Sequence, residues 1–370
     1  MHEPLIRYLV SSPYGDEPVD KDKIDFPLEV DPLGTPYRKY LDSLRNFLAR
    51  EEFKPLLNAV SQKLKRDVLL EKIDEIIIRA EKHGALYHPA SVELFLKEEK
   101  TKFCLDVAVT ETGKNWLREE FYVLKNLQIK YDLPYLPDAY FFDNVDSASF
   151  LLEEWFEGYH EFHIAVNEKG RHSLKLWEFG SGYTYLTSRQ SCEIYEQASK
   201  ILTLYYDLAD FRHIYPWHHA AGDFVARMDN EKIDVRLTTA RRYEPLMDFD
   251  KNTVDPLFAL FYFFSLLSLK MRLDKVDGMS EVVWAEDYCV EAMVTGFLEA
   301  VKLKEEKNHY PGLVNEFLDL AKSFSREDMK VSFQPLIDFF SGTGDFPVIN
   351  GNLDNHVEKL HATLQNLPLQ

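Results

Sequence analysis

Cysteine and basic residues are scarce in this sequence. Cys104, Cys192 and Cys289 lie far apart and form no Cys-x-x-Cys pair, so they predict neither a disulfide framework nor a structural zinc site. The 43 lysines and arginines are outnumbered by 62 aspartates and glutamates, which gives a formal net charge of −19. Nonspecific binding to nucleic acid or to an anionic membrane needs a basic patch. We therefore expect neither nucleic acid nor a membrane as a partner.

Long apolar runs and targeting segments are also missing. The run at 257–269 has thirteen residues, which is short of the roughly 20 needed to span a bilayer, and it predicts a buried core helix. The N-terminus shows no basic segment followed by an apolar one, so no secretory signal is expected. Together with the cysteine spacing, this favours a reducing cytoplasm.

Hydrophobic residues, in contrast, are plentiful. They make up 45% of the chain, and aromatic residues 14%, which suffices for one large or two modest domains. Residues 1–36 are rich in Pro, Asp and Gly and predict an extended surface arm or a partly disordered segment. In residues 37–70, apolar side chains recur every three or four positions, which predicts one or two amphipathic helices.

The patterns that follow predict a small sheet with one inserted helix, and then a part that is mostly helical. Alternation of apolar and polar residues predicts strands, and apolar residues three or four positions apart predict a helix. The predicted strands are at 73–79, 91–96, 102–110, 140–142 and 150–155, and the predicted helix is at 116–127. After residue 158 a capping box at Thr187 and Gln190 starts a helix that ends near 206. A hairpin over 224–238 interrupts the helical part. Further helices are expected near 256–272, 285–305, 310–324 and 331–341.

This order of elements resembles the protein-kinase-like fold, and more closely its aminoglycoside-phosphotransferase branch. The resemblance covers about residues 70–300. It implies an α+β fold with a small antiparallel sheet lobe, a larger helical lobe and an N-terminal helical extension. The implied division is an arm and extension over 1–70, the sheet lobe over 71–157 and the helical lobe over 158–370.

The strand that leads to Gly158 resembles the hinge of these enzymes. In the family, backbone groups of the hinge bind the adenine of ATP. The resemblance assigns this role to the carbonyl of Glu154 and the amide of Phe156, and it depends on backbone position rather than on side-chain identity. An ordinary strand and turn is the alternative interpretation.

Other parts of the sheet lobe match the phosphate site only in part. Ala108 suits the strand position whose side chain covers the adenine ring in the family. Glu120 matches the helix glutamate that pairs with the phosphate-binding lysine. Thr110 stands where that lysine belongs. Alternation places Lys102, Cys104, Asp106, Ala108 and Thr110 on one face of the strand. Lys102 would replace the missing lysine only in a different register. The loop at 81–89 has one glycine, so few backbone amides can approach a phosphate.

The segment before the hairpin resembles the catalytic loop with altered residues. Aligned on the hairpin, Asp223 takes the position of the metal-binding asparagine, and His218 that of the catalytic aspartate. A carboxylate preserves metal binding, whereas a neutral imidazole can accept a proton but adds no negative charge beside Mg²⁺. Thr238 stands where the second metal-binding aspartate is expected. Asp255 resembles the residue that braces the loop, or it is a simple helix N-cap.

Three functions follow from these residues. The lysine, the metal aspartate and the base are all altered, so we expect a catalytically degenerate, pseudokinase-type binding or scaffolding module, which leaves binding of ATP and Mg²⁺ open. Its partner would be a protein. The second is a phosphotransferase for a small hydroxylated or amine-bearing acceptor, with His218 or His219 as base and Asp223 as metal ligand. The third is a metal-dependent hydrolase that uses His213, His218, His219 and Asp223.

Overall fold

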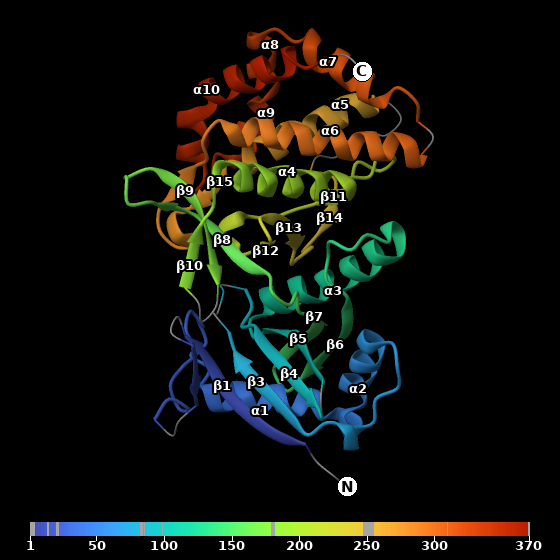
Figure 1. The fold of residues 1–370 in the computed structure, drawn as a ribbon, viewed down its shortest axis with the longest axis vertical. Helices are drawn as coiled ribbons and strands as arrows, with labels where there is room; N and C mark the ends of the chain where they lie inside the picture. Colours follow the sequence, from blue (N-terminus) through green and yellow to red (C-terminus); the bar gives the residue numbers. More distant parts are fainter. Residues whose placement is uncertain are drawn as a thin grey trace. The chain divides into compact units, whose positions relative to one another are not determined.

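In the computed structural model the chain divides into two compact units, unit 1 (Met1–Glu157) and unit 2 (Gly158–Gln370) (Figure 1). The structure describes residues 4–12, 15–19, 22–81, 84, 86–97, 99–178, 182–246, 255–308 and 310–368. Lys82, His83 and Ala85, which belong to the loop compared above with a phosphate-binding loop, lie outside the described residues. The architecture is mixed, with a multi-stranded sheet in unit 1 and most of the helices in unit 2.

Unit 1 is built around one sheet with the strand order β2-β1-β3-β4-β5-β7-β6. All neighbours are antiparallel except β1 and β3, which are parallel. The strands are β1 (Leu5–Ser12), β2 (Gly15–Pro18), β3 (Glu75–Ala80), β4 (Ala90–Leu96), β5 (Glu99–Ala108), β6 (Ala139–Val145) and β7 (Ala148–Glu154). The five strands predicted from alternation correspond to β3 to β7. The first two replace the expected arm, because β1 is ordered by pairing with β3, far along the chain.

The two faces of this sheet differ in character. Helices α1 (Tyr37–Leu48) and α2 (Arg50–Leu64) share one hydrophobic core with alternate residues of the strands, where the Phe47 ring stacks on Phe150 at 4.9 Å between centroids. Helix α3 (Glu111–Tyr131) contacts β5, β6 and β7, and its buried Leu117 and Leu124 are not part of that core. Since successive side chains of a strand point to opposite faces, the second face holds the charged residues described below.

Unit 2 begins with strands where mostly helix was expected. β8 (His160–Val166), β9 (His172–Glu178) and β10 (Gly182–Tyr185) join a sheet with the order β10-β9-β8-β12-β13. Residues 162–165 of β8 are all buried, so both faces of this strand are covered in its middle. The predicted hairpin is confirmed as β12 (Phe224–Asp229) and β13 (Lys232–Leu237), which pair along their whole length. Short pairs join β11 (His213–Ile214) to β14 (Tyr243–Glu244) and β15 (Leu273–Lys275) to β16 (Val282–Trp284).

Two helices of unit 2 begin at the residues that the sequence signals indicate. The predicted capping box is present at Thr187 and begins α4 (Ser188–Leu204), and Asp255 caps α5 by accepting the Leu257 amide at 2.9 Å. The apolar run at 257–269 lies in α5 and is buried from Ala259 onward, apart from the half-buried Tyr262. No helix in the described part of the chain is long and apolar enough to cross a membrane. The later helices are α5 (Pro256–Lys270), α6 (Tyr288–Asn308), α7 (Leu313–Ser323), α8 (Arg326–Ser332), α9 (Gln334–Phe340) and α10 (Phe346–Gln365).

A buried ion pair joins β8 to β15 in unit 2. His163 Nδ1 lies 3.4 Å from Asp274 Oδ1 and His163 Nε2 lies 3.3 Å from Glu161 Oε2, while Asp274 Oδ2 accepts the Ile164 amide at 2.8 Å. Burial lowers the pKa of His163, but the bonds to Asp274 and Glu161 outweigh it and raise the pKa to about 9. The charged histidine therefore stabilises the folded protein at neutral pH.

This pair predicts a pH-dependent stability. Because the folded-state pKa lies above the unfolded value, the contribution of His163 is complete below about pH 6.5 and is lost as pH rises through about 9, by roughly 2–4 kcal/mol. Urea unfolding at a series of pH values checks this. A His163→Gln variant should lose most of the slope over that range, whereas His172→Gln, at an exposed position on β9, should keep it. An unchanged slope in His163→Gln would contradict the assignment.

Candidate functional site

The second face of the unit 1 sheet carries a group of charged and nucleophilic side chains. We call it the polar face. It lies opposite the hydrophobic core described above, and alternation along the strands selects its members. They are Arg79 on β3, Ser91 and Glu93 on β4, Lys102, Cys104 and Asp106 on β5, and Glu153 on β7.

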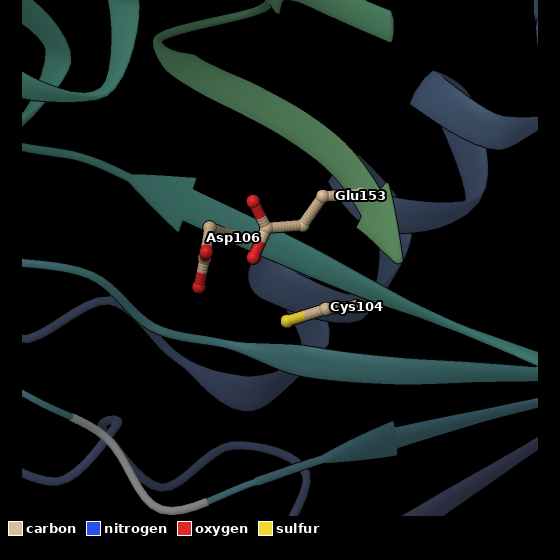
Figure 2. A group of neighbouring side chains, drawn as sticks. All are labelled: Cys104, Asp106 and Glu153. Carbon is tan, nitrogen blue, oxygen red and sulfur yellow. The ribbon is translucent and has the colours of Figure 1, made fainter. Parts of the chain in front are cut away.

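Three of these side chains converge on one point. Cys104 and Asp106 are two residues apart on β5, and Glu153 of β7 pairs directly with Cys104 in the antiparallel register. Their thiol and carboxylate atoms all lie within 4.8 Å of one another, and Figure 2 shows the three side chains gathered on one side of the two strands. Central strands hold side chains in fixed positions, so this grouping is set by backbone pairing.

The electrostatics of this cluster are unbalanced. Glu153 is only 5% exposed, and its Oε2 has no hydrogen-bond partner among the described residues. Burial raises the pKa of the Glu153 carboxyl well above its usual range, and the negative charges of Asp106, Glu120 and Glu154 raise it further. Burial and the charges of Asp106, Glu153 and Glu81 raise the pKa of the Cys104 thiol, and the positive charge of Lys102 opposes them. A cation or a shared proton would relieve this repulsion.

Lys102, on the same strand, is engaged elsewhere. Its ammonium lies 3.8 Å from the centroid of the Trp155 ring and 4.0 Å from Glu81 Oε1. Burial lowers its pKa, opposed by Glu81. Thr110, at the family's lysine position, is the N-cap of α3, where its hydroxyl accepts the Gly113 amide at 3.1 Å. Thr110 thus has a helix-capping role.

Two of the residues assigned to ATP binding lie near the polar face. Ala108 is fully buried at the end of β5, beside Gly113 at the start of α3. Glu120 on α3 is buried, and its Oε2 accepts a hydrogen bond from the Tyr87 hydroxyl at 2.9 Å. Glu120 adds negative charge near Glu153. Their roles toward a nucleotide stay predictions.

Glu154 and Phe156 lie at the end of β7 and just after it. The Glu154 amide donates to the Asp138 carbonyl at 2.8 Å. The hinge role predicted for these residues uses the carbonyl of Glu154 and the amide of Phe156, and it stays a prediction.

In unit 2, the residues assigned to catalysis form a short turn before β12. His218 caps the 3₁₀ turn His219–Ala221, where its Nδ1 accepts the Ala220 amide at 3.0 Å. The Nδ1 lone pair, which a general base would use to accept a proton, is therefore already occupied by this hydrogen bond. His218 Nε2 lies 3.6 Å from Asp345 Oδ1, beyond hydrogen-bond length, and His218 and Lys270 together lower the pKa of Asp345 to about 2.

Asp223, the assigned metal ligand, is held by an arginine. Arg241 donates from both terminal nitrogens to the two carboxylate oxygens, at 2.7 Å and 2.8 Å, and the His218 amide donates to Asp223 Oδ2 at 2.8 Å. Asp223 is 1% exposed. A bidentate pair of this kind is among the stronger polar contacts in proteins, so a metal ion would have to displace the guanidinium.

His219 and His213 lie among aromatic rings. His219 is buried next to Trp217 and Phe224, with ring centroids 5.7 Å and 5.3 Å away, and neither of its ring nitrogens has a hydrogen-bond partner among the described residues. His213 is buried against Phe263 at 5.2 Å. Burial lowers the pKa of both histidines to about 4, so both are neutral at physiological pH.

The hydrolase hypothesis required these histidines and Asp223 to surround one ion. Their ligand atoms do not meet: across the described ranges, the residues whose thiol, imidazole or carboxylate atoms gather closely enough for an ion are Cys104, Asp106 and Glu153. The sequence analysis placed Cys104 and Asp106 on one strand face but missed Glu153, because that contact depends on the register of β5 against β7. It also missed the role of Arg241, which no local pattern signals.

Comparison with known proteins leaves the family open. No family model matches the chain, and no curated protein does. Among solved structures, the chain is similar to the pseudokinase domain of BIR2, an immune regulator of the RLK/Pelle family, with 12% identity over 94% of this chain and 92% of that chain. The TM-score is 0.30, too low for this likeness to establish a shared fold.

Proposed function

We propose that the chain is a kinase-like binding or scaffolding module that does not transfer phosphoryl groups. The order of its elements supports this. Strands β3, β4 and β5 precede helix α3, strands β6 and β7 follow, and unit 2 contains α4 and then the β12–β13 hairpin. This is the order that the resemblance implies. The strands β1, β2 and β8 to β10 are additions to it.

The observation that carries the proposal is the Asp223–Arg241 pair. In phosphotransferases of this kind, carboxylate and amide oxygens hold Mg²⁺ against the phosphates. Here both oxygens of the carboxylate at that position accept from one guanidinium. Loss of a single charge-stabilising contact of this type costs on the order of 10²–10³ in rate.

Two threonines support the same conclusion. Thr110 caps α3 in place of the phosphate-binding lysine. Thr238, in place of the second metal-binding aspartate, donates its hydroxyl to the Gly222 carbonyl at 3.1 Å and so fastens the loop to the hairpin. At both positions, therefore, a threonine makes a structural hydrogen bond where the family has a charged side chain. A protein partner suits such a module better than a small-molecule acceptor.

Thermal unfolding of the metal-stripped protein with ATP, with and without Mg²⁺ or Mn²⁺, tests the proposal. A ligand at about 100 times its dissociation constant adds about 2.7 kcal/mol of stability, which is readily measured. We expect no rise in thermal stability that requires ATP and the metal ion together. Stabilisation by ATP alone would agree with a module that retains nucleotide without a metal site.

The contrary outcome is equally specific. A rise in thermal stability that needs both ATP and Mg²⁺ would refute the proposal if Asp223→Ala abolishes it and Asp234→Ala preserves it. That result would support a phosphotransferase that uses Asp223. Asp234 is a suitable control because it lies on the same hairpin, partly exposed and paired with Arg236. A screen of hydroxylated and amine-bearing acceptors would then follow.

A further inference from the structure

The cluster on β5 and β7 of unit 1 has the composition of a metal site. Two strand residues of one face and their cross-strand neighbour supply one thiol and two carboxylates. We infer that Cys104, Asp106 and Glu153 bind a divalent cation of the zinc type. The site is made of residues of unit 1 alone and does not depend on the kinase-like proposal.

The geometry is close to that of a bound ion. Ligand atoms at about 2.0–2.3 Å from one tetrahedral ion lie about 3.3–3.8 Å from each other. The three groups are already within 4.8 Å of one another, so small side-chain rotations would suffice (Figure 2). The backbone need not move, because the Cys104–Glu153 pairing is part of a continuous antiparallel ladder between two interior strands.

The unpartnered Glu153 oxygen is the independent observation. A buried carboxylate normally has hydrogen-bond or ion-pair partners, since leaving it without any is costly. Glu153 Oε2 has none among the described residues. Of the cations on the polar face, Arg79 binds Asp16, and Lys102 lies over Trp155 and 4.0 Å from Glu81. A divalent cation would provide the partner that the Glu153 oxygen lacks among the described residues.

The donor set selects the class of metal. Mg²⁺ and Ca²⁺ bind oxygen donors, whereas a thiolate favours Zn²⁺ and related transition ions, which also accept carboxylates. Three protein ligands leave a fourth position of a tetrahedral ion for water or another ligand. The competing account is that the carboxyls share protons and bind no metal.

Two titrations of the metal-stripped protein test the inference. Zn²⁺ is added in competition with a chromophoric chelator, and Co²⁺ binding is followed by absorbance. We expect one ion per chain and a thiolate-to-cobalt charge-transfer band. Glu153→Gln, which keeps the shape of the side chain, should weaken Zn²⁺ binding by at least about tenfold. Cys104→Ser should abolish the charge-transfer band.

Matched controls locate the ion. Cys192→Ser removes a cysteine on α4, and Glu93→Gln removes a carboxylate on the same sheet face that is paired with Lys100; both should bind as the wild type does. A further test needs no mutation. If Zn²⁺ binds at this site, it should protect Cys104 of the wild-type protein from an alkylating reagent, which peptide mass spectrometry measures. Absence of binding, or binding that Cys104→Ser and Glu153→Gln leave unchanged, would overturn the inference in favour of shared protons.

Discussion

Replacing Gly296 with alanine is expected to destabilise unit 2 by about 3 kcal/mol or more. Gly296 lies in α6 where this helix crosses α4, and the two helices run side by side (Figure 1). A Cβ atom at Gly296 would lie 1.9 Å from the carbonyl oxygen of Glu196. Both atoms are attached to helix backbone, so no side-chain rotation relieves the overlap and the helices must separate.

Urea unfolding followed by circular dichroism measures the loss, and hydrogen exchange of peptides from α4 and α6 localises it. Gly351→Ala is the matched control. Gly351 lies in α10 with open space where its Cβ would be, so alanine should stabilise that helix by about 0.5–1 kcal/mol through its better helix propensity. Equal effects at the two glycines would show that the α4–α6 contact is not as close as described.

The sequence predicts the elements whose signals are local. The alternation in β5, the capping box at Thr187 and the apolar run of α5 each lie within one continuous segment, and each predicts its element correctly. Elements that depend on partners far along the chain were missed. β1 pairs with β3, and β8 pairs with the β12–β13 hairpin, so their strand character comes from these neighbours.

Helix α10 was missed for a related reason. Its residues 350–355 are asparagine, glycine and aspartate apart from one leucine, and these residues have low intrinsic helix propensity. The helix is stabilised instead by burial of Ile349, Val357, Leu360 and Leu364 against the rest of unit 2. Tertiary contacts therefore decide its structure, as they commonly do for weak helix formers.

The candidate sites likewise have features that the local sequence predicts and features that depend on distant parts of the chain. Period-two alternation was enough to place Cys104 and Asp106 on one face of a strand, but nothing in the sequence near Glu153 indicates that it pairs with Cys104. Likewise, residues 213–223 suggest a metal cluster by their density of histidines, whereas in the fold His213 and His219 lie in separate aromatic surroundings.

The largest effect expected of a side-chain truncation near the loop is at Arg241. Arg241→Met keeps the aliphatic part of the side chain and removes the guanidinium that binds both oxygens of Asp223. The carboxylate, 1% exposed, would keep the hydrogen bond from the His218 amide but lose both bonds from the guanidinium. Removing one partner of a buried pair costs about 3–5 kcal/mol, which urea unfolding would measure.

Arg242→Met is the control, because Arg242 pairs with Glu244 at 3.5 Å between two exposed side chains, and such pairs contribute at most about 1 kcal/mol. The double variant Arg241→Met/Asp223→Asn separates charge from shape. Asparagine keeps an oxygen to accept the His218 amide but carries no charge, so the double variant should be more stable than Arg241→Met alone. If the second substitution instead adds to the loss, the cost at Arg241 comes from lost packing and not from the uncompensated charge of Asp223.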